Sequence, residues 1–199
     1  MRLNRSFFEK NTIEVARNLI GSLFKFETSE GVASGVIIET EAYLGEEDKA
    51  SHARFGRDGK GRLMFGMPGV AYVYLIYGMH YMFNVVTEPE GVAGAVLIRA
   101  LVPVEGVELM KKRRRTEDVK NLTSGPARLT SAFGITLEQN GRDITTGPLG
   151  IWEYIEVDKK DVLSTPRIGV IGWKEKPWRF VLGEYFVQRI KEGGKIIES

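Results

Sequence analysis

The chain has 199 residues, no cysteine and a formal net charge of only +2. Its length fits one domain with an ordinary buried core, and the lack of cysteine excludes disulfides, thiolate zinc sites and thiol nucleophiles. With so little net charge, affinity for nucleic acid must come from local clusters of basic residues. The first ten residues lack the apolar core of a signal peptide, and no apolar run is long enough to span a membrane, which predicts a soluble, cytoplasmic protein without membrane contact.

The predicted elements begin with a helix and continue as β-strands. Asn11, with Glu14 three residues later, has the pattern of a capping box, and Gly21 closes the helix. The residues that follow alternate between apolar and polar with a period of two, which indicates antiparallel strands joined by turns. These strands are predicted at 23–26, 32–41, 70–76, 81–87 and 95–103.

A polar, glycine-rich segment, residues 44–63, separates the second of these strands from the third, and loops of this length are usually functional or mobile. After the fifth strand, residues 104–115 have a helical pattern that ends in a basic cluster, Lys111 to Arg115. A second helix is predicted after Thr123, whose hydroxyl would cap it. Short strands are predicted at 151–157, 168–171 and 179–182.

Two carboxylates mark the end of the second predicted strand. Glu39 and Glu41 are two residues apart, so their side chains project to the same face of the sheet. The apolar residues before them place at least one carboxylate at the rim of the core, where desolvation and a nearby cation tune its basicity. Arg99 is a charge in an otherwise apolar strand and needs a carboxylate partner. This pattern fits a general base, and it equally fits an ion pair that only holds the sheet together.

Residues 72–81 (YVYLIYGMHY) contain four tyrosines and one histidine. Tyr72 and Tyr74 share one face of their strand while Tyr77 points to the other, so some of these rings must pack in the core. Tyr77, however, adjoins Gly78 at a predicted hairpin tip, where a side chain is exposed and suits a wedge between base steps. Aromatic rings beside a carboxylate suggest an enzyme that handles a nucleobase outside its helix.

His52 follows the acidic residues 46–48, a grouping that raises the question of a metal site. The spacing matches no recognised set of ligands, and acidic loop residues are usually solvated. The sequence therefore predicts no metal.

Taken together, the chain resembles the alkyladenine (3-methyladenine) DNA glycosylase family over nearly its whole length. The segments that carry the resemblance, in family order, are ETEAYLG at 39–45, YVYLIYGM at 72–79, LIRAL at 97–101, SGP at 124–126, RIGV at 167–170 and KPWRF at 176–180. The resemblance implies a mixed α/β (α+β) fold: a single domain, residues 1–199, around a curved, mainly antiparallel sheet with flanking helices and a DNA-inserting β-hairpin. It also implies that no cofactor is needed. The segment between His52 and Met64 departs from the family pattern, so phosphate contacts from that loop do not follow from the resemblance.

By this resemblance the protein is a monofunctional glycosylase of base excision repair, acting as a monomer on double-stranded DNA in a prokaryotic cell. It would rotate damaged purines such as 3-methyladenine, 7-methylguanine, hypoxanthine or ethenoadenine out of the duplex and hydrolyse the N-glycosidic bond, without AP-lyase activity. Glu41 would be the general base, with Glu39 as its rival, and Arg99 would orient Glu41 or its water. Tyr77 would fill the vacated space in the duplex. The base pocket would comprise Tyr43, His52, Tyr74, Met79, Asn84, Leu97, Ile168 and Gly169, and the DNA backbone would contact Arg57, Lys60, Arg62, Ser124 and Arg128.

Asn84 is an amide in an apolar strand, so it either satisfies a structural hydrogen bond or faces a polar pocket. In the second case it would exclude the 2-amino group of guanine. Two other kinds of protein remain as alternatives. One is a non-catalytic nucleic-acid-binding domain, and the other is a metal-dependent nuclease that uses the carboxylates with Asp48 and His52.

Overall fold

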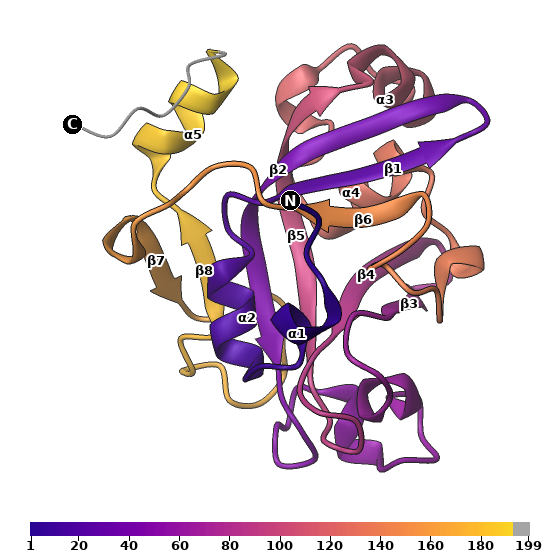
Figure 1. Cartoon of the computed structure of the whole chain (residues 1–199), viewed down its shortest axis with the longest axis vertical. Helices are drawn as coiled ribbons and strands as arrows, with labels where there is room; N and C mark the ends of the chain where they lie inside the picture. The colour runs from indigo at the N-terminus through magenta and orange to yellow at the C-terminus, as the bar shows by residue number, and fades with distance from the viewer. Residues whose placement is uncertain (193–199) are drawn as a thin grey trace.

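Strand β2 (Gly31–Tyr43) is the longest strand and organises the sheet. It pairs with β5 (Ala95–Glu105) along one edge and, along the other, first with β1 (Leu23–Thr28) and then with β8 (Arg179–Leu182). Shifts in the β2–β5 register, one between residues 34 and 35 and two between residues 37 and 40, mark bulges. Bulges bend a strand and increase its twist, and β2 visibly changes direction along its length (Figure 1).

The computed structural model describes residues 1–192, and all strand pairs in them are antiparallel. The strand order is β3-β4-β5-β2-β1-β6, with β8 added to β2 and β7 added to β8. The remaining strands are β3 (Ala71–Ile76), β4 (His80–Val86), β6 (Leu149–Trp152) and β7 (Val162–Thr165). The α-helices are α1 (Arg5–Phe8), α2 (Thr12–Asn18), α3 (Val107–Arg114), α4 (Pro126–Phe133) and α5 (Glu184–Lys191). Short 3-10 helices are η1 (His52–Phe55), η2 (Arg62–Phe65), η3 (Val119–Asn121), η4 (Leu137–Gln139) and η5 (Lys159–Asp161). The predicted α+β class with a mainly antiparallel sheet is confirmed.

The core lies between this sheet and the helices that pack on it. Phe24 of β1 contacts Phe83 of β4 and Phe133 of α4, with ring centroids 4.9 and 5.1 Å apart, and all three side chains are fully buried. Helix α2 is tied to β2 because the Thr40 hydroxyl donates to the carbonyl of Ala16, 2.7 Å away. Strand pairing on both sides of β5 and these core contacts fix β2, β4 and β5 relative to one another, and the candidate site lies on those three strands and β3.

The predicted first helix and the five strands of the N-terminal half are confirmed to within a few residues. Asn11 caps α2 by accepting from the backbone N–H groups of Ile13 and Glu14. The predicted helix at 104–115 starts three residues late, because β5 continues to Glu105 and Gly106 takes a left-handed φ of 77° between strand and helix. The predicted loop 44–63 contains η1 and the start of η2.

Predictions for the C-terminal half were less accurate. The strand predicted at 151–157 ends at Trp152, as β6. Residues 168–171 are not a strand, because Gly169 has a φ of 73° and the apolar side chains of Ile168 and Ile171 are exposed. The predicted strand at 179–182 is present as β8, which pairs with β2 and β7. The hydroxyl of Thr123 does not cap α4 but donates to the carbonyl of Leu101, and the helix starts after Gly125 without a side-chain cap.

Candidate active site at the end of strand β2

The carboxylate of Glu41 is fully buried and held from three sides. Its Oε1 atom lies 3.2 Å from Nη1 of Arg99 and accepts the backbone N–H of Ile168 at 2.8 Å. Its Oε2 atom accepts the hydroxyl of Tyr43 at 2.8 Å. A buried carboxylate is tolerated only with such partners, and here they also fix its orientation.

Glu39 occupies a different environment two residues earlier. Its Oε2 atom accepts from Nε and Nη2 of Arg179 at 3.1 and 2.8 Å, and it lies 3.6 Å from Nε of Arg99. The predicted ion pair is therefore present, and Arg99 bridges both carboxylates. Paired with two guanidinium groups, Glu39 is the structural partner, whereas Glu41 is joined through Tyr43 to the neighbouring cavity.

This cavity is lined by aromatic and small side chains from β2, β3, β4, β5 and the 44–65 segment: Tyr43, Ala50, His52, Met64, Tyr72, Tyr74, Asn84 and Ala95. The rings of His52 and Tyr74 meet edge to face, with centroids 4.5 Å apart. Its volume is about 20 Å³, room for about one water molecule. This volume is too small for an aromatic ring system, and the segment that carries Ala50, His52 and Met64 is the part of the lining that lies outside the sheet.

His52 hydrogen-bonds a tyrosine of the cavity. Its Nδ1 atom lies 2.7 Å from the hydroxyl of Tyr72, and that hydroxyl also lies 3.1 Å from the carbonyl of Lys60. When the single phenol proton is donated to Lys60, Nδ1 is the donor to Tyr72 and Nε2 of the neutral ring is left as an acceptor. Burial, together with the charges of Lys60 and Arg54, lowers the pKa of His52 and favours this neutral form.

The tyrosines of the cavity are also neutral. Burial, with the nearby Glu41 carboxylate, raises the pKa of Tyr74 to about 12 and raises that of Tyr43 still further above its usual value. Burial likewise raises the pKa of Tyr72. At neutral pH the cavity therefore has neutral aromatic walls beside one buried carboxylate.

Asn84 fits both readings of its sequence position. It is 3% exposed, and its Nδ2 atom donates to the carbonyl of Tyr72 at 3.1 Å. The same side chain lines the aromatic cavity. Leu97 of β5 pairs with Asn84 of β4 on one side and with Glu41 of β2 on the other, so these two residues lie on the strands that flank β5.

The β3–β4 hairpin ends in an exposed aromatic tip. Tyr77 is 85% exposed with a φ of 52°, and Gly78 has a φ of 69° with nothing close to where a Cβ would stand. Met79, the next residue, is also exposed. Tyr77 is therefore not a core residue, and it stands on the same hairpin as Tyr72, Tyr74 and Asn84 of the cavity.

Comparison with known proteins adds an independent observation. The sequence pattern of the family described as methylpurine-DNA glycosylase matches residues 6–185. The chain belongs to this family. Three relatives carry the name "Putative 3-methyladenine DNA glycosylase". That of Prosthecochloris aestuarii is 45% identical over 179 residues, covering 89% of this chain and 86% of the relative. That of Chlorobium luteolum is 42% identical and covers 92% of this chain and 94% of the relative. That of Methanoculleus marisnigri is also 42% identical and covers 95% of this chain and 100% of the relative.

The structure places several residues differently from the sequence-based predictions. Asp48 was expected to be solvated, but it is fully buried, and its two oxygens accept from Arg167 at 2.7 and 2.8 Å. Four cavity-lining residues were not assigned to the site: Ala50, Met64, Tyr72 and Ala95. Of these four, only Tyr72 could have been predicted from the sequence, because it shares a strand face with Tyr74. Four residues predicted for the pocket do not line this cavity in the described chain: Met79, Leu97, Ile168 and Gly169.

The basic residues predicted for DNA contact already have protein partners in several cases. Arg57 donates to the carbonyl of Gly91 at 2.7 Å. Arg128 donates to the Ser124 hydroxyl at 2.9 Å, so two residues predicted to contact the DNA backbone bind each other. In the basic cluster, Lys111 pairs with Glu108 and Glu117, and Arg113 with Glu30. The cluster is therefore partly neutralised, and Arg62 lies apart from it in η2.

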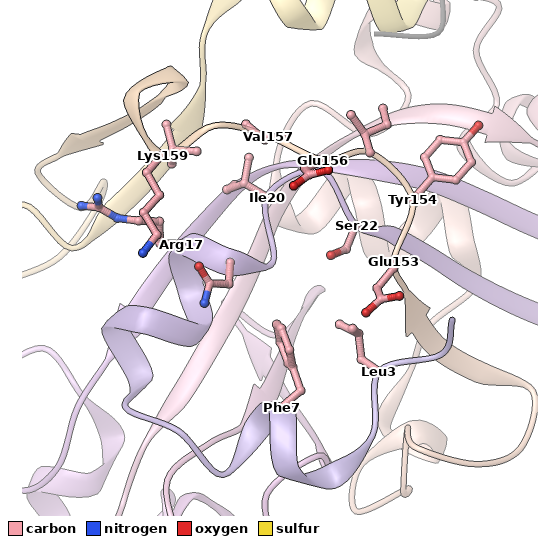
Figure 2. A pocket seen from close by; sticks show the side chains of 13 residues that line it. Leu3, Phe7, Arg17, Ile20, Ser22, Glu153, Tyr154, Glu156, Val157 and Lys159 are labelled. Carbon is pink, nitrogen blue, oxygen red and sulfur yellow. The ribbon is translucent and has the colours of Figure 1, made fainter. Parts of the chain in front are cut away.

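A larger hollow of about 550 Å³ lies between the N-terminal helices and the segment that follows β6 (Figure 2). Its lining mixes apolar side chains such as Leu3 and Phe7 with charged ones such as Arg17 and Glu156. It shares no lining residue with the aromatic cavity. We therefore identify the candidate site in this glycosylase-family chain by the buried Glu41 carboxylate beside the aromatic cavity, and not by the volume of the hollow.

Two further observations concern residues 1–192 alone. No group of three or more histidine, aspartate or glutamate side chains is placed there to hold a metal ion. None of the helices in this range combines the length and the hydropathy needed to cross a bilayer.

Proposed function

We propose that this protein hydrolyses the N-glycosidic bond of damaged purines in duplex DNA, releasing the free base and leaving an abasic site. The observation that carries the proposal is the buried Glu41 carboxylate, held by Arg99 and joined through Tyr43 to a cavity with aromatic walls. A carboxylate fixed beside a stacking surface supplies both requirements of the reaction, a base and a place for the purine.

The first step is access to the sugar and the base. Both are shielded inside the stacked duplex, so the nucleotide rotates out at a cost of a few kcal/mol, which is smallest for lesions that pair poorly. Tyr77, exposed at the hairpin tip, enters the space that the base leaves and keeps it from returning. The purine then stacks against Tyr43 with Tyr74 and His52 on its other side, and the cavity widens to admit it.

The second step is cleavage. As the bond between C1′ and the base nitrogen lengthens, positive charge develops on the sugar and the electron pair leaves with the base. Glu41 takes a proton from a water molecule whose oxygen bonds to C1′, and its negative charge stabilises the cationic sugar. Arg99 holds Glu41 in place, and the carbonyl of Ile168 accepts the other hydrogen of the water. The cavity lining contains no lysine, and without an amine nucleophile the strand stays intact.

Selection against normal bases follows from the cavity wall. Asn84 is fixed by its bond to the carbonyl of Tyr72, and it occupies the space that the 2-amino group of guanine would need. Adenine-shaped bases and hypoxanthine lack that group and fit. The neutral tautomer of His52 offers an acceptor at Nε2, which suits an exocyclic N–H of an adenine derivative. We therefore propose 3-methyladenine, hypoxanthine and ethenoadenine as substrates that fit the cavity. We also propose 7-methylguanine, which keeps the 2-amino group and fits less well, because its positive charge weakens the glycosidic bond that is cleaved.

The proposal is tested with duplexes that each carry one lesion, incubated with the purified protein in parallel with and without a metal chelator. Free base is separated by chromatography, and strand integrity is measured by denaturing electrophoresis before and after alkali. The expected result is base release with strand breaks that appear only after alkali. No base release would favour the non-catalytic binder, and strand breaks before alkali that chelator abolishes would favour the nuclease.

A further inference from the structure

Behind the cavity wall lies a buried ion pair that the proposed mechanism does not use. The guanidinium of Arg167 binds both oxygens of Asp48 at 2.7 and 2.8 Å, and it also donates to the carbonyl of Ala42 at 3.0 Å. Neither side chain of the pair has any exposed surface. A pair this deep costs desolvation free energy that a well-packed apolar pair would avoid, so its charges call for an explanation beyond stability.

The Arg167 guanidinium lies between two aromatic rings. Its central carbon is 4.7 Å from the ring centroid of Tyr43 and 4.9 Å from that of Trp178. Tyr43 lines the aromatic cavity, but Arg167 does not. Because the guanidinium packs over the Tyr43 ring and has no exposed surface, a base that stacks on this ring from the cavity would meet the opposite face.

The same arginine adjoins the residue that holds Glu41. Arg167 precedes Ile168, whose backbone N–H donates to Glu41 at 2.8 Å, and its bond to Ala42 fixes the chain between Glu41 and Tyr43. Asp48 completes this connection, because it also accepts the backbone N–H of Leu44 at 3.1 Å. The pair thus joins the end of β2 to the segment after β7, from both sides of Tyr43.

We propose that the Asp48–Arg167 pair is a positioning element that holds Tyr43 and Glu41 in register and, through its zero net charge, lets a positively charged purine stack on Tyr43. The inference rests on the proposed function and goes beyond it by assigning the acceptance of cationic bases to two residues that touch neither base nor water. Methylation at N7 of guanine or N3 of adenine gives such a cationic base, whereas hypoxanthine is neutral.

The distances make the charge balance consequential. A base in van der Waals contact with the free face of Tyr43 lies roughly 3.5 Å from the ring, so its charge would be roughly 8 Å from the guanidinium of Arg167. At that separation, in a partly buried site, two unit charges repel strongly enough to change an equilibrium about tenfold or more. Asp48, within 2.8 Å of the guanidinium, cancels most of this repulsion.

The test compares single-turnover release of 7-methylguanine and of hypoxanthine from matched duplexes. Asp48→Asn keeps the shape of the side chain but leaves the Arg167 cation unbalanced. We expect the 7-methylguanine to hypoxanthine rate ratio to fall about tenfold or more relative to the wild type. Asp143→Asn, which removes one partner of the remote Arg5–Asp143 pair, is the matched control and should leave the ratio unchanged.

Two further variants separate charge from position. The double variant Asp48→Asn/Arg167→Met removes both charges, so both rates should fall while the ratio returns to within about threefold of the wild type. Arg167→Lys keeps the charge but loses the planar fork, and should lower both rates with a near-wild-type ratio. Circular dichroism and thermal unfolding establish which variants fold; if Asp48→Asn does not, the other two decide.

An unchanged ratio in folded Asp48→Asn, or a ratio in the double variant that stays low, overturns the charge assignment. Unchanged rates in Arg167→Lys overturn the positioning role. A wild-type protein that releases neither base refutes the proposed function itself, which distinguishes that failure from failure of this inference.

Discussion

Replacing Glu41 with glutamine removes the proposed base while nearly preserving side-chain shape. The carboxylate accepts the Ile168 N–H on Oε1 and the Tyr43 hydroxyl on Oε2, and it is ion-paired with the Arg99 guanidinium. A glutamine has one acceptor oxygen and one donor NH₂ group, so one of the two hydrogen-bond donors loses its acceptor and the ion pair loses its negative charge. An unsatisfied buried donor costs about 1–3 kcal/mol, and we expect the free energy of unfolding to fall by that amount.

The effect on catalysis should be larger than the effect on stability. Loss of a general base typically lowers the rate by about 10²–10⁴-fold, and Glu41 also stabilises the developing positive charge, so single-turnover base release should fall by at least this factor. Binding to lesion DNA should survive, because the aromatic walls and the hairpin are unchanged. Urea unfolding, single-turnover release and equilibrium DNA binding on one preparation give the three quantities.

Glu39→Gln is the matched control. It removes a carboxylate two residues away that is held mainly by Arg179, and it leaves the contacts of Glu41 intact. Base release should fall much less than in Glu41→Gln. If the Glu39 change proves the more damaging to single-turnover release, the assignment of the base is wrong.

Four other predictions follow from the same geometry. Tyr77→Ala should slow release of stably paired hypoxanthine or ethenoadenine more than release of the same base from a mismatch; equal loss on both would point to a structural role for the ring. Asn84→Ser should keep hypoxanthine release within about tenfold, roughly 1.4 kcal/mol, and raise release of guanine opposite thymine; a folded variant without that gain would refute the exclusion role. Because the folded state lowers the pKa of His52, its contribution to stability is present above about pH 6.5 and is lost as pH falls. The free energy of unfolding should therefore drop more between pH 7.5 and 5.5 in the wild type and in the His80→Gln control than in His52→Gln. Affinity for undamaged DNA should fall steeply with salt, and Arg57→Ala should reduce the log-log slope by about 1; a wild-type slope near zero would refute an electrostatic footprint.

The features that the sequence predicted correctly depend on local patterns. The alternation around Glu39 and Glu41, the charge of Arg99 in an apolar strand and the turn at Gly78 each depend on neighbours within a few residues. With two carboxylates on one strand face and one arginine in an apolar strand, the possible ion pairs were Arg99 with Glu39 and Arg99 with Glu41. The structure contains both pairs.

Long-range packing accounts for the failures. Asp48 and Arg167 are 119 residues apart, and nothing in an acidic loop indicates that one carboxylate will be buried against a distant arginine. Residues 168–171 have the composition of a strand, but Gly169 and Gly172 take left-handed conformations and the backbone N–H of Ile168 donates to Glu41. Thr123 has the pattern of a helix cap, yet its hydroxyl satisfies the carbonyl of Leu101 on β5 instead. In each case a tertiary contact overrode a local preference.

The central claim is that the aromatic cavity beside Glu41 and the tip of the β3–β4 hairpin act on the same nucleotide. A crystal structure of Glu41→Gln bound to a duplex with one hypoxanthine tests it most directly. We predict the purine between Tyr43 and Tyr74, the ring of Tyr77 inside the duplex at the vacated position, and a water molecule between residue 41 and C1′. A hypoxanthine that remains stacked in the duplex while the protein is bound, or that lies in any other hollow of the molecule, would contradict the account.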